Sequence, residues 1–421
     1  MMKGISLFSS AGIAETYLKD IGIEIVVANE LLEKRAKFHK HLYPDCEMIQ
    51  GDIRDVKIRQ KIESFISNDV NLLLATPPCQ GLSTLGKNKK QKHYENDIRN
   101  YLIFDVFYFI DKYEFNYILI ENVPKFLQMH FPYEDSYKTL LEILHLKYSD
   151  KYIIESDILN AKDYGVPQSR PRAIIKMYKK NLKWGWPEKE PEILLKDVLW
   201  DLPSLESGES SNIKWHSSKF HNERDILAMK HTPTGQSAFK NIVYYPKKNN
   251  GNKISGFHNT YKRMNWDSPA PARTTNSGNI GSHNNVHPGR KLPDGTYSDA
   301  RVLTVHELLI VSSLPKKWDI PEWATDNMIR HVIGESIPPL MAKKFCIRLE
   351  NKIWVKTRSI GLFNGIHQIW IYYSQLQNIL LMNTEKQLIR QRFKKFYFFF
   401  KKINYIILET KKYQVLLYQL K

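Results

Sequence analysis

The chain has 421 residues, which is enough for two or three domains with developed hydrophobic cores. Hydrophobic residues make up 42% of it and no apolar run reaches the length of a membrane helix, so the composition is that of a globular protein and excludes a membrane-spanning one. The formal net charge of +18 favours a polyanionic partner, although residues 351–421 supply +11 of that charge.

The three cysteines bear on where the protein works. Cys46, Cys79 and Cys346 form neither an even disulfide framework nor a CxxC metal pair, which suits a reducing cytosol. The chain enters a strand-like run at once, without the pattern of a signal sequence. We therefore expect a cytoplasmic protein that holds no metal, does not enter a membrane and acts as a monomer.

The first 178 residues alternate strand-like and helix-like runs. The strand-like runs are 4–8, 23–28, 47–50, 71–75, 117–121, 152–156 and 173–177, and the helical patterns between the earlier ones are 13–21, 32–41, 58–66 and 99–113. Strands separated by helices imply right-handed βαβ units, so the sequence predicts an α/β fold with a doubly wound, mostly parallel sheet. In this fold the fourth and fifth strands are neighbours.

The pattern changes beyond this first domain, which spans residues 1–178. Residues 179–300 are interrupted by Trp, Pro, Gly and Asn, which predicts a smaller, loop-rich domain with short strands. Helical patterns return at 301–310 and 329–349, and we expect residues 301–350 to complete the first domain. Residues 351–421 form a basic extension of unknown role, in which 390–402 either bind phosphates or belong to an unselected tail.

Chemically useful side chains follow three of the predicted strands or lie beside them. The run ATPPCQG at residues 75–81 puts Cys79 on a loop, with two prolines before it and a glycine after it. The fifth strand ends in Glu121 and Asn122, and the run QSRPR contributes Arg170 and Arg172. A cysteine, a glutamate and paired arginines at strand ends can attack and hold a pyrimidine ring.

These three motifs resemble the PCQ, ENV and QxRxR motifs of the DNA (cytosine-5)-methyltransferases. The resemblance covers residues 3–350: RVLTVHE at 301–307 is similar to the RxLTxRE helix, with His306 where arginine is usual. IGESIPP at 333–339 looks like the final GNSV motif, with Glu335 in place of the common asparagine. The resemblance implies the S-adenosylmethionine-dependent methyltransferase fold, with residues 179–300 as the target-recognition domain.

The turn after the first strand is the expected cofactor loop. It resembles the FxGxG loop of the family, but Ser10 and Ile13 stand at positions that are commonly glycine. In this topology such a turn places a nucleotide-like ligand over a helix N-terminus, and NAD is disfavoured because the three-glycine fingerprint is missing. The resemblance implies S-adenosylmethionine, with Glu30 at the ribose and Asp52 at the adenine amine. The expected cofactor-binding residues are Phe8, Ser9, Ala11, Gly12, Glu30, Asp52, Ile53, Pro78, Leu102 and Ser336.

The chemistry requires a nucleophile because C5 of cytosine does not attack a sulfonium methyl group unaided. Cys79 is expected to add to C6 as a thiolate, while Glu121 hydrogen-bonds N3 and the exocyclic amine. By resemblance, Arg172 points at O2 and Arg170 supports the loop or a phosphate. The target base must leave the duplex, and residues 81–100 form either a lid over the DNA or an ordinary solvated loop.

The stretch between the QSRPR and RVLTVHE motifs carries interleaved aromatic and basic residues, which suits contacts to phosphates and base edges. Some of them are expected to be structural. The candidates are Trp215, His216, Lys219, Tyr244, Tyr245, Lys247, Lys248, Tyr261, Lys262, Arg263 and Trp266, with His258 and Arg273 ambiguous.

Three interpretations of the whole chain stay open. The first is a DNA (cytosine-5)-methyltransferase that acts on duplex DNA and protects it from a cognate restriction endonuclease. An RNA cytosine-5 methyltransferase would share the pocket, but the long recognition insert favours DNA. A catalytically inactive, sequence-specific DNA-binding protein would keep the fold; Cys79, Glu121 and Arg172 argue against it, whereas the altered cofactor loop argues for it.

Overall fold

The computed structural model describes residues 1–78 and 97–349. Several predicted features lie outside the described residues, namely Cys79, most of the 81–100 segment, and the 351–421 extension with its 390–402 run. Met1–Glu350 forms one compact unit, to which the following description refers.

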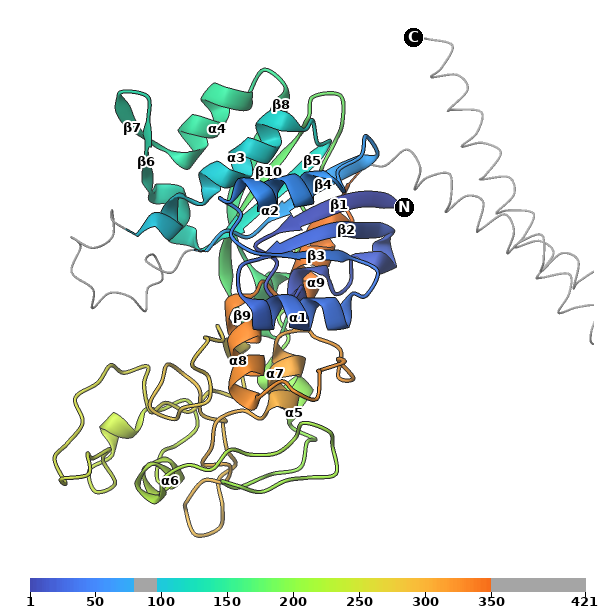
Figure 1. Cartoon of the computed structure of the whole chain (residues 1–421). Helices are drawn as coiled ribbons and strands as arrows, with labels where there is room; N and C mark the ends of the chain where they lie inside the picture. Colours follow the sequence, from blue (N-terminus) through green and yellow to red (C-terminus); the bar gives the residue numbers. More distant parts are fainter. Residues whose placement is uncertain (79–96, 350–421) are drawn as a thin grey trace, which may run out of the picture. The chain divides into compact units, whose positions relative to one another are not determined.

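A seven-stranded sheet forms the upper half of this unit in Figure 1, with strand order β3-β2-β1-β4-β5-β10-β8. Its strands are β1 (Met2–Leu7), β2 (Ile23–Glu30), β3 (Glu47–Gln50), β4 (Val70–Ala75), β5 (Tyr117–Asn122), β8 (Tyr152–Asn160) and β10 (Pro171–Lys179). β10 is antiparallel to both of its neighbours, while the pairs among β1 to β5 are parallel. The predicted α/β fold with a mostly parallel sheet is confirmed, and β4 and β5 are neighbours as expected.

Helices cover both faces of the sheet. The α-helices are α1 (Glu33–Leu42), α2 (Val56–Glu63), α3 (Ile103–Lys112), α4 (Leu140–Tyr148), α5 (Leu195–Leu199), α6 (Glu223–Lys230), α7 (Val305–Val311), α8 (Asp326–Glu335) and α9 (Pro339–Cys346). Residues of β4 alternate between two cores, because Leu73 packs with α2, α3 and α4 whereas Leu72 and Leu74 pack with α9. Within the described ranges, no helix is both long and apolar enough to cross a bilayer.

Short elements connect the main ones. They are the 3-10 turns η1 (Ile13–Glu15), η2 (Lys19–Ile21), η5 (Ile98–Tyr101), η6 (Pro124–Gln128), η7 (Ala161–Tyr164) and η8 (Ala238–Lys240), and the strands β6 (His130–Tyr133), β7 (Ser136–Thr139), β9 (Gln168–Ser169) and β11 (Ala270–Pro271). β6 and β7 form an antiparallel hairpin before α4, an arrangement that the periodicity did not predict.

The helix predicted over residues 13–21 is wrong. Only η1 and η2 form there, because Gly12 and Gly22 are left-handed at the two ends and the Thr16 hydroxyl donates to the Ile13 carbonyl oxygen. Glu15 also turns inward to a buried ion pair with His39, 2.9 Å away. A three-residue turn has no long helix dipole behind it, so the expected helix N-terminus under the ligand is replaced by loop amides.

The single helix predicted over residues 329–349 is also divided. α8 ends at Glu335 and α9 begins at Pro339. Pro338 and Pro339 explain the break, since proline disfavours a helical residue before it and lacks the N–H that continues a helix. The break directs the end of α8 toward the cofactor loop.

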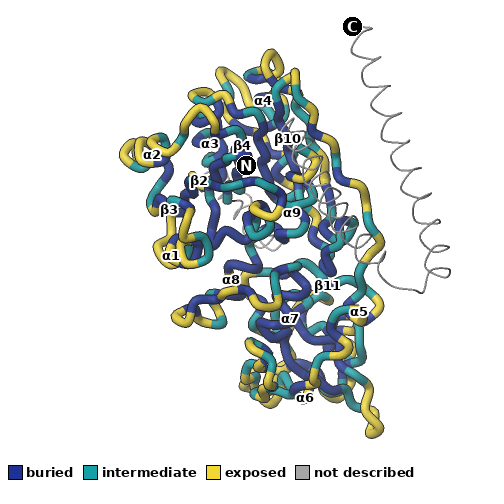
Figure 2. The backbone as a smooth tube through the Cα atoms, turned by 90° about the vertical axis from the view of Figure 1, so that its right-hand side faces the viewer, coloured by how far each residue is buried: buried dark blue, intermediate teal, exposed yellow. Residues whose placement is uncertain are grey.

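Residues 179–300 contain little regular structure, as the composition predicts. A third core joins α5, α7 and α8 with Phe38 of α1. Figure 2 shows α7 as a buried segment and α6 as a segment of mixed burial. The loop-rich region is therefore held to the sheet domain through the buried helices that follow it.

Candidate active site

The carboxyl ends of four parallel strands meet at one edge of the sheet. The register pairs Leu7 of β1 with both Asn29 of β2 and Ala75 of β4, and it pairs Ala75 with Ile120 of β5. The loops that leave these strands therefore start side by side. They carry the predicted cofactor loop, Glu30, the approach to Cys79, and Glu121.

The loop after β1 is tightly turned and clamped to β2. Phe8, Ser10 and Gly12 all have positive φ, at 60°, 50° and 72°. The Ser9 N–H and hydroxyl both donate to the Asn29 carbonyl oxygen, at 3.0 and 3.2 Å. A positive φ is unfavourable for residues other than glycine, so contacts outside the loop must hold Phe8 and Ser10 in this conformation.

Glu30 lies at the end of β2 and is buried. Its carboxylate accepts the Ser10 N–H at 3.0 Å and the Leu32 N–H at 2.8 Å, and Arg35 lies 3.9 Å away. Burial raises the pKa of Glu30; Glu335 adds to this rise, while the two N–H groups and Arg35 oppose it. Glu30 thus shapes the loop as well as being a candidate for binding a ribose.

Asp52 follows β3 and is partly exposed. Its two carboxylate oxygens accept hydrogen bonds from Arg54, at 3.0 and 2.5 Å from Nε and Nη2. These bonds lower the pKa of Asp52. An adenine amine at this carboxylate would have to share it with Arg54. The next residue, Ile53, is buried in the sheet core.

The other predicted cofactor residues lie in different settings. Pro78 and Leu102 are partly buried. The Ser336 hydroxyl donates to the Val332 carbonyl oxygen of its own helix at 2.7 Å. A Cβ on Gly12 would lie 2.4 Å from the ring of Tyr43. Packing against Tyr43 therefore requires glycine at this position.

Glu121 and Arg172 form an ion pair at the edge of the sheet. β10 places Ala173 opposite Asn122, so Arg172, one residue earlier, lies beyond the end of β5. Arg172 Nε is 2.8 Å from Glu121 Oε1, and both side chains are mostly buried. Burial raises the pKa of Glu121, while Arg172 and Arg170 act in the opposite direction. The pair therefore places a buried carboxyl group, whose pKa burial raises, directly against a guanidinium group.

The strand that leads to Cys79 is tied to the same edge. The Asn122 side-chain amide donates to the Pro77 carbonyl oxygen at 3.0 Å, and the Thr76 hydroxyl donates to the Phe8 carbonyl oxygen at 3.0 Å. Cys79 itself lies outside the described residues. The described chain therefore approaches it between the cofactor loop and Glu121.

Arg170 is buried and faces backbone carbonyl groups. Its Nη1 donates to the Arg273 carbonyl oxygen at 2.7 Å and its Nη2 to the Gly334 carbonyl oxygen at 2.8 Å. Gln168 accepts the Arg273 N–H at 3.1 Å. The QSRPR segment thus joins β10 to the 270s loop and to the end of α8.

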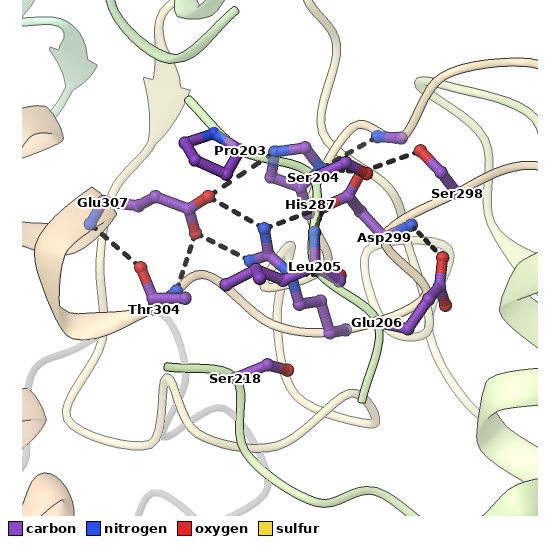
Figure 3. Close-up of polar contacts among 12 residues, drawn as sticks. Pro203, Ser204, Leu205, Glu206, Ser218, His287, Ser298, Asp299, Thr304 and Glu307 are labelled. Atoms are coloured by element: carbon purple, nitrogen blue, oxygen red, sulfur yellow. Dashed lines mark hydrogen bonds and ion pairs between the residues drawn. The ribbon is translucent and has the colours of Figure 1, made fainter. Parts of the chain in front are cut away.

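The 301–307 segment forms a buried charged cluster (Figure 3). Arg301 lies 2.8 Å from Glu307 Oε2 and 2.8 Å from Asp299 Oδ1. Thr304 caps α7 in a reciprocal capping box with Glu307. Although burial opposes the shift, Arg301 and His287 lower the pKa of Glu307 to about 2, and burial lowers that of His287 to about 4.

This cluster is structural, because its members are almost wholly buried. Asp299 also accepts from the Ser204 hydroxyl at 2.6 Å and the Leu205 N–H at 3.0 Å. The contacts draw the segment around residue 204 onto the start of α7. His306, at the position where arginine is usual, is buried beside His216.

The predicted recognition residues differ in burial, and Trp215, Lys219, Tyr245, Tyr261 and Lys262 are partly buried. His216, Arg263 and Trp266 are buried, and the Arg263 guanidinium donates to backbone carbonyl oxygens, so these three are structural. Lys247 and Lys248 are exposed. Residues 226–266 contain six lysines and one arginine and no Asp or Glu. The exposed part of this stretch is therefore uniformly basic.

An apolar tip projects from the same basic stretch. Ile242 is 94% exposed and Val243 is 70% exposed. The Asn241 amide anchors the turn to the Ala228 carbonyl oxygen at 3.0 Å, and the Tyr244 ring stacks on His231 with ring centroids 3.6 Å apart. The tip is held in place even though its two aliphatic side chains face solvent.

Arg35 is the main residue that the motif analysis missed. It reaches both Glu30 and Glu335, which are far apart in the chain. The available signal was indirect: Ser10 and Glu335 depart from the motif pattern, and a departure in one motif can be accommodated by a contact with the other.

Comparisons with known proteins find similarity over nearly the whole Met1–Glu350 unit. A family model described as C-5 cytosine-specific DNA methylase matches residues 2–351. Type II methyltransferase M1.HgaI of Avibacterium volantium is 47% identical over 350 residues, which cover 83% of this chain and 98% of that protein. Type II methyltransferase M.NgoPII of Neisseria gonorrhoeae is 31% identical over 208 residues, which cover 48% of this chain and 57% of that protein.

Solved structures share the fold. A DNA modification methyltransferase encoded within a prophage of E. coli aligns with a TM-score of 0.60 and 18% identity, covering 82% of this chain and 98% of that one. The DNMT2 mutant of Spodoptera frugiperda aligns with a TM-score of 0.53 and 18% identity, covering 83% of this chain and 100% of that one. At such identities the likeness concerns the fold alone.

Proposed function

The chain belongs to the C-5 cytosine-specific DNA methylase family, and on this premise we propose how it works and what it protects. It is a DNA (cytosine-5)-methyltransferase. We propose that it transfers a methyl group from S-adenosylmethionine to C5 of a flipped-out cytosine in a specific duplex sequence, through a covalent bond between Cys79 and C6. The observation that carries the proposal is the Glu121–Arg172 pair beside the strand that leads to Cys79.

The residues at the ends of β1 to β3 fit the cofactor. Glu30 offers a buried carboxylate that can accept hydrogen bonds from a ribose diol, and Asp52 offers a partly exposed one. When bound, S-adenosylmethionine supplies the methyl group as a sulfonium substituent. The clamped loop from Phe8 to Gly12 would form one wall of its site.

Glu121 and Arg172 would hold the pyrimidine. A protonated Glu121 would donate to N3 while its carbonyl oxygen accepts from the exocyclic amine; burial, which raises the pKa of Glu121, acts toward that state, and Arg172 and Arg170 act against it. Arg172 would hydrogen-bond O2. As the Cys79 thiolate forms a bond to C6, the electron pair moves toward N3, where Glu121 neutralises it. C5 would then take the sulfonium methyl group, with the neutral thioether S-adenosylhomocysteine as the leaving group. Transfer of the C5 proton to a water or side-chain base, with cleavage of the C6–S bond and return of the N3 proton to Glu121, would restore the ring and free Cys79.

We assign Arg170 a positioning role in this scheme. Its guanidinium holds the carbonyl groups of Arg273 and Gly334, which lie in the recognition region and in α8. By anchoring the chain one residue before Pro171, Arg170 would fix the position of Arg172 indirectly.

Residues 179–300 would read the target. The acid-free stretch 226–266 supplies exposed lysines for phosphates, and Ile242 and Val243 supply an apolar tip for base edges. The names of the two sequence relatives mark them as Type II methyltransferases. We accordingly propose that methylation here protects DNA from a cognate restriction endonuclease.

The reaction is tested by tritiated methyl transfer and by trapping. Wild-type protein should label duplex DNA and not tRNA, and bisulfite sequencing should locate the modified cytosine in one sequence context. In a duplex whose target is 5-fluorocytosine, methyl transfer should leave a stable protein–DNA adduct, because fluorine cannot leave C5 as a proton does. Labelling of tRNA alone, or a fluorinated duplex that never forms an adduct, would contradict the proposal.

The recognition surface is tested by the double variant Lys247→Ala/Lys248→Ala. If both lysines contact phosphates, DNA affinity should fall and the slope of log K against log[salt] should become shallower by about 2. Lys57→Ala/Lys61→Ala on α2 removes two exposed lysines from the sheet domain and serves as the matched control. An unchanged salt slope in the first variant would exclude this surface from the interface.

A further inference from the structure

Two departures from the family motifs touch each other in the structure. The Ser10 hydroxyl donates to Glu335 Oε1 at 2.5 Å, although 325 positions separate the two residues. Ser10 stands where glycine is common in the cofactor loop, and Glu335 stands where asparagine is common. A contact between two unusual residues indicates that each accommodates the other.

The conformation of Ser10 explains why it needs a partner. Its φ of 50° lies in the left-handed region, which is strained for a residue with a Cβ. Glycine would adopt the same φ without this strain. Serine can remain there because its N–H donates to Glu30 and its hydroxyl donates to Glu335.

Arg35 completes a closed ring of contacts. Its Nη2 lies 2.6 Å from Glu335 Oε2, and its Nη1 lies 3.9 Å from Glu30 Oε1. The two carboxylates both bind Ser10 and would repel each other if Arg35 were absent. His331, one turn before Glu335, adds a weaker contact at 3.4 Å. Three segments of the chain are joined in this way: the cofactor loop, the start of α1 and the end of α8.

The end of α8 is a firm support for this ring. A Cβ on Gly334 would lie 2.3 Å from the Thr274 carbonyl, so the backbones are in close contact there, and the Gly334 carbonyl oxygen accepts from Arg170. An open groove of about 490 Å³ runs along α1 and α8 and is bordered by Arg35 and His331. The Glu335 side chain is itself 21% exposed, so shortening it leaves no sealed cavity in the core.

We propose that Ser10, Arg35 and Glu335 are positioning residues that hold the cofactor loop in its binding conformation, so that serine does here what glycine does in related loops. This inference rests on the proposed use of S-adenosylmethionine. Glu335 supplies the acceptor that keeps Ser10 left-handed, and Arg35 keeps Glu335 beside Glu30. Its contacts are all made between protein groups, so the ring would lower the ordering cost of binding.

The test compares alanine and glycine at position 10, with S-adenosylmethionine binding measured by calorimetry in the absence of DNA. Ser10→Ala loses the hydroxyl but keeps the strain, so Kd should rise about tenfold, which corresponds to about 1.4 kcal/mol. Ser10→Gly loses the hydroxyl and the strain together, so Kd should rise less than about threefold. Glu335→Ala should cost about tenfold in the wild type and less than about threefold in the Ser10→Gly background.

Controls separate this inference from the proposed function. Glu33→Gln removes an exposed carboxylate from the first turn of α1 and should leave Kd unchanged. Melting temperatures of the ligand-free variants check folding, and Glu335→Gln, which keeps an acceptor for Ser10, should recover most of the affinity. If the wild type does not bind S-adenosylmethionine, the proposed cofactor fails. If the wild type binds and Ser10→Ala has the same Kd, the positioning role is refuted while the proposed cofactor stands. The same conclusion follows if the effects of Ser10→Ala and Glu335→Ala on the binding free energy simply add in the double variant.

Discussion

Glu121→Gln is expected to lower kcat by about 10²–10⁴-fold while DNA binding is retained. Glutamine can still pair with the cytosine edge, because its amide donates to N3 and its oxygen accepts from the exocyclic amine. It has no acidic proton to give to N3 as negative charge develops there. The variant therefore isolates charge neutralisation from base recognition. Single-turnover methyl transfer at saturating DNA measures the effect.

Two further substitutions serve as comparisons for Glu121→Gln. Glu121→Ala removes both the proton and the hydrogen bonds, and it should weaken binding of the everted base as well as kcat. Glu114→Gln changes an exposed carboxylate just before β5 and should leave the rate unchanged. A rate for Glu121→Gln within tenfold of the wild type would mean that this carboxyl group does not neutralise N3.

Cys79→Ser is expected to reduce turnover by several orders of magnitude, because a serine hydroxyl is far less acidic and less nucleophilic than a thiol. DNA affinity should stay close to the wild-type value. The same variant should form no adduct with the 5-fluorocytosine duplex under conditions that trap the wild type. Loss of methyl transfer and of adduct formation, with DNA affinity retained, would identify Cys79 as the nucleophile.

Cys346→Ala supplies the matched control for the loss of a thiol. Cys346 is buried in α9, and burial raises its pKa to about 12, so it has no thiolate character near neutral pH. Its replacement should leave turnover intact. Full activity in Cys79→Ser, or loss of activity in Cys346→Ala without unfolding, would overturn the assignment of the nucleophile.

The active-site edge combines residues with distinct physical environments. Glu121 is buried against a cation, whereas Asp52 is partly exposed and paired with Arg54. Burial raises the pKa of the first carboxyl group and hydrogen bonding lowers that of the second. The two carboxyl groups at this edge of the sheet therefore have pKa values shifted in opposite directions, which suits the different roles proposed for them.

The family assignment made from three short motifs is confirmed by the match over residues 2–351. Motif recognition succeeded because PCQ, ENV and QxRxR are local: each follows or adjoins a strand, and a few neighbouring residues determine its geometry. The roles of individual site residues stay predictions. Helix limits were less predictable, since the 13–21 pattern is interrupted by Glu15 turning toward His39, a residue 24 positions away.

The sequence by itself determined the strands of the mostly parallel sheet, the adjacency of the fourth and fifth strands and the identity of the chemical groups at the strand ends. These follow from period-two burial and from proline and glycine in the loops, which act within a few residues. The antiparallel position of β10 between β5 and β8, in contrast, appeared only in the structure. Tertiary structure alone decided that Ser10 meets Glu335 and that Arg170 braces the 270s loop. Such contacts join residues more than 100 positions apart, and their formation depends on how packed segments approach each other in space, for which a single chain carries no local signal.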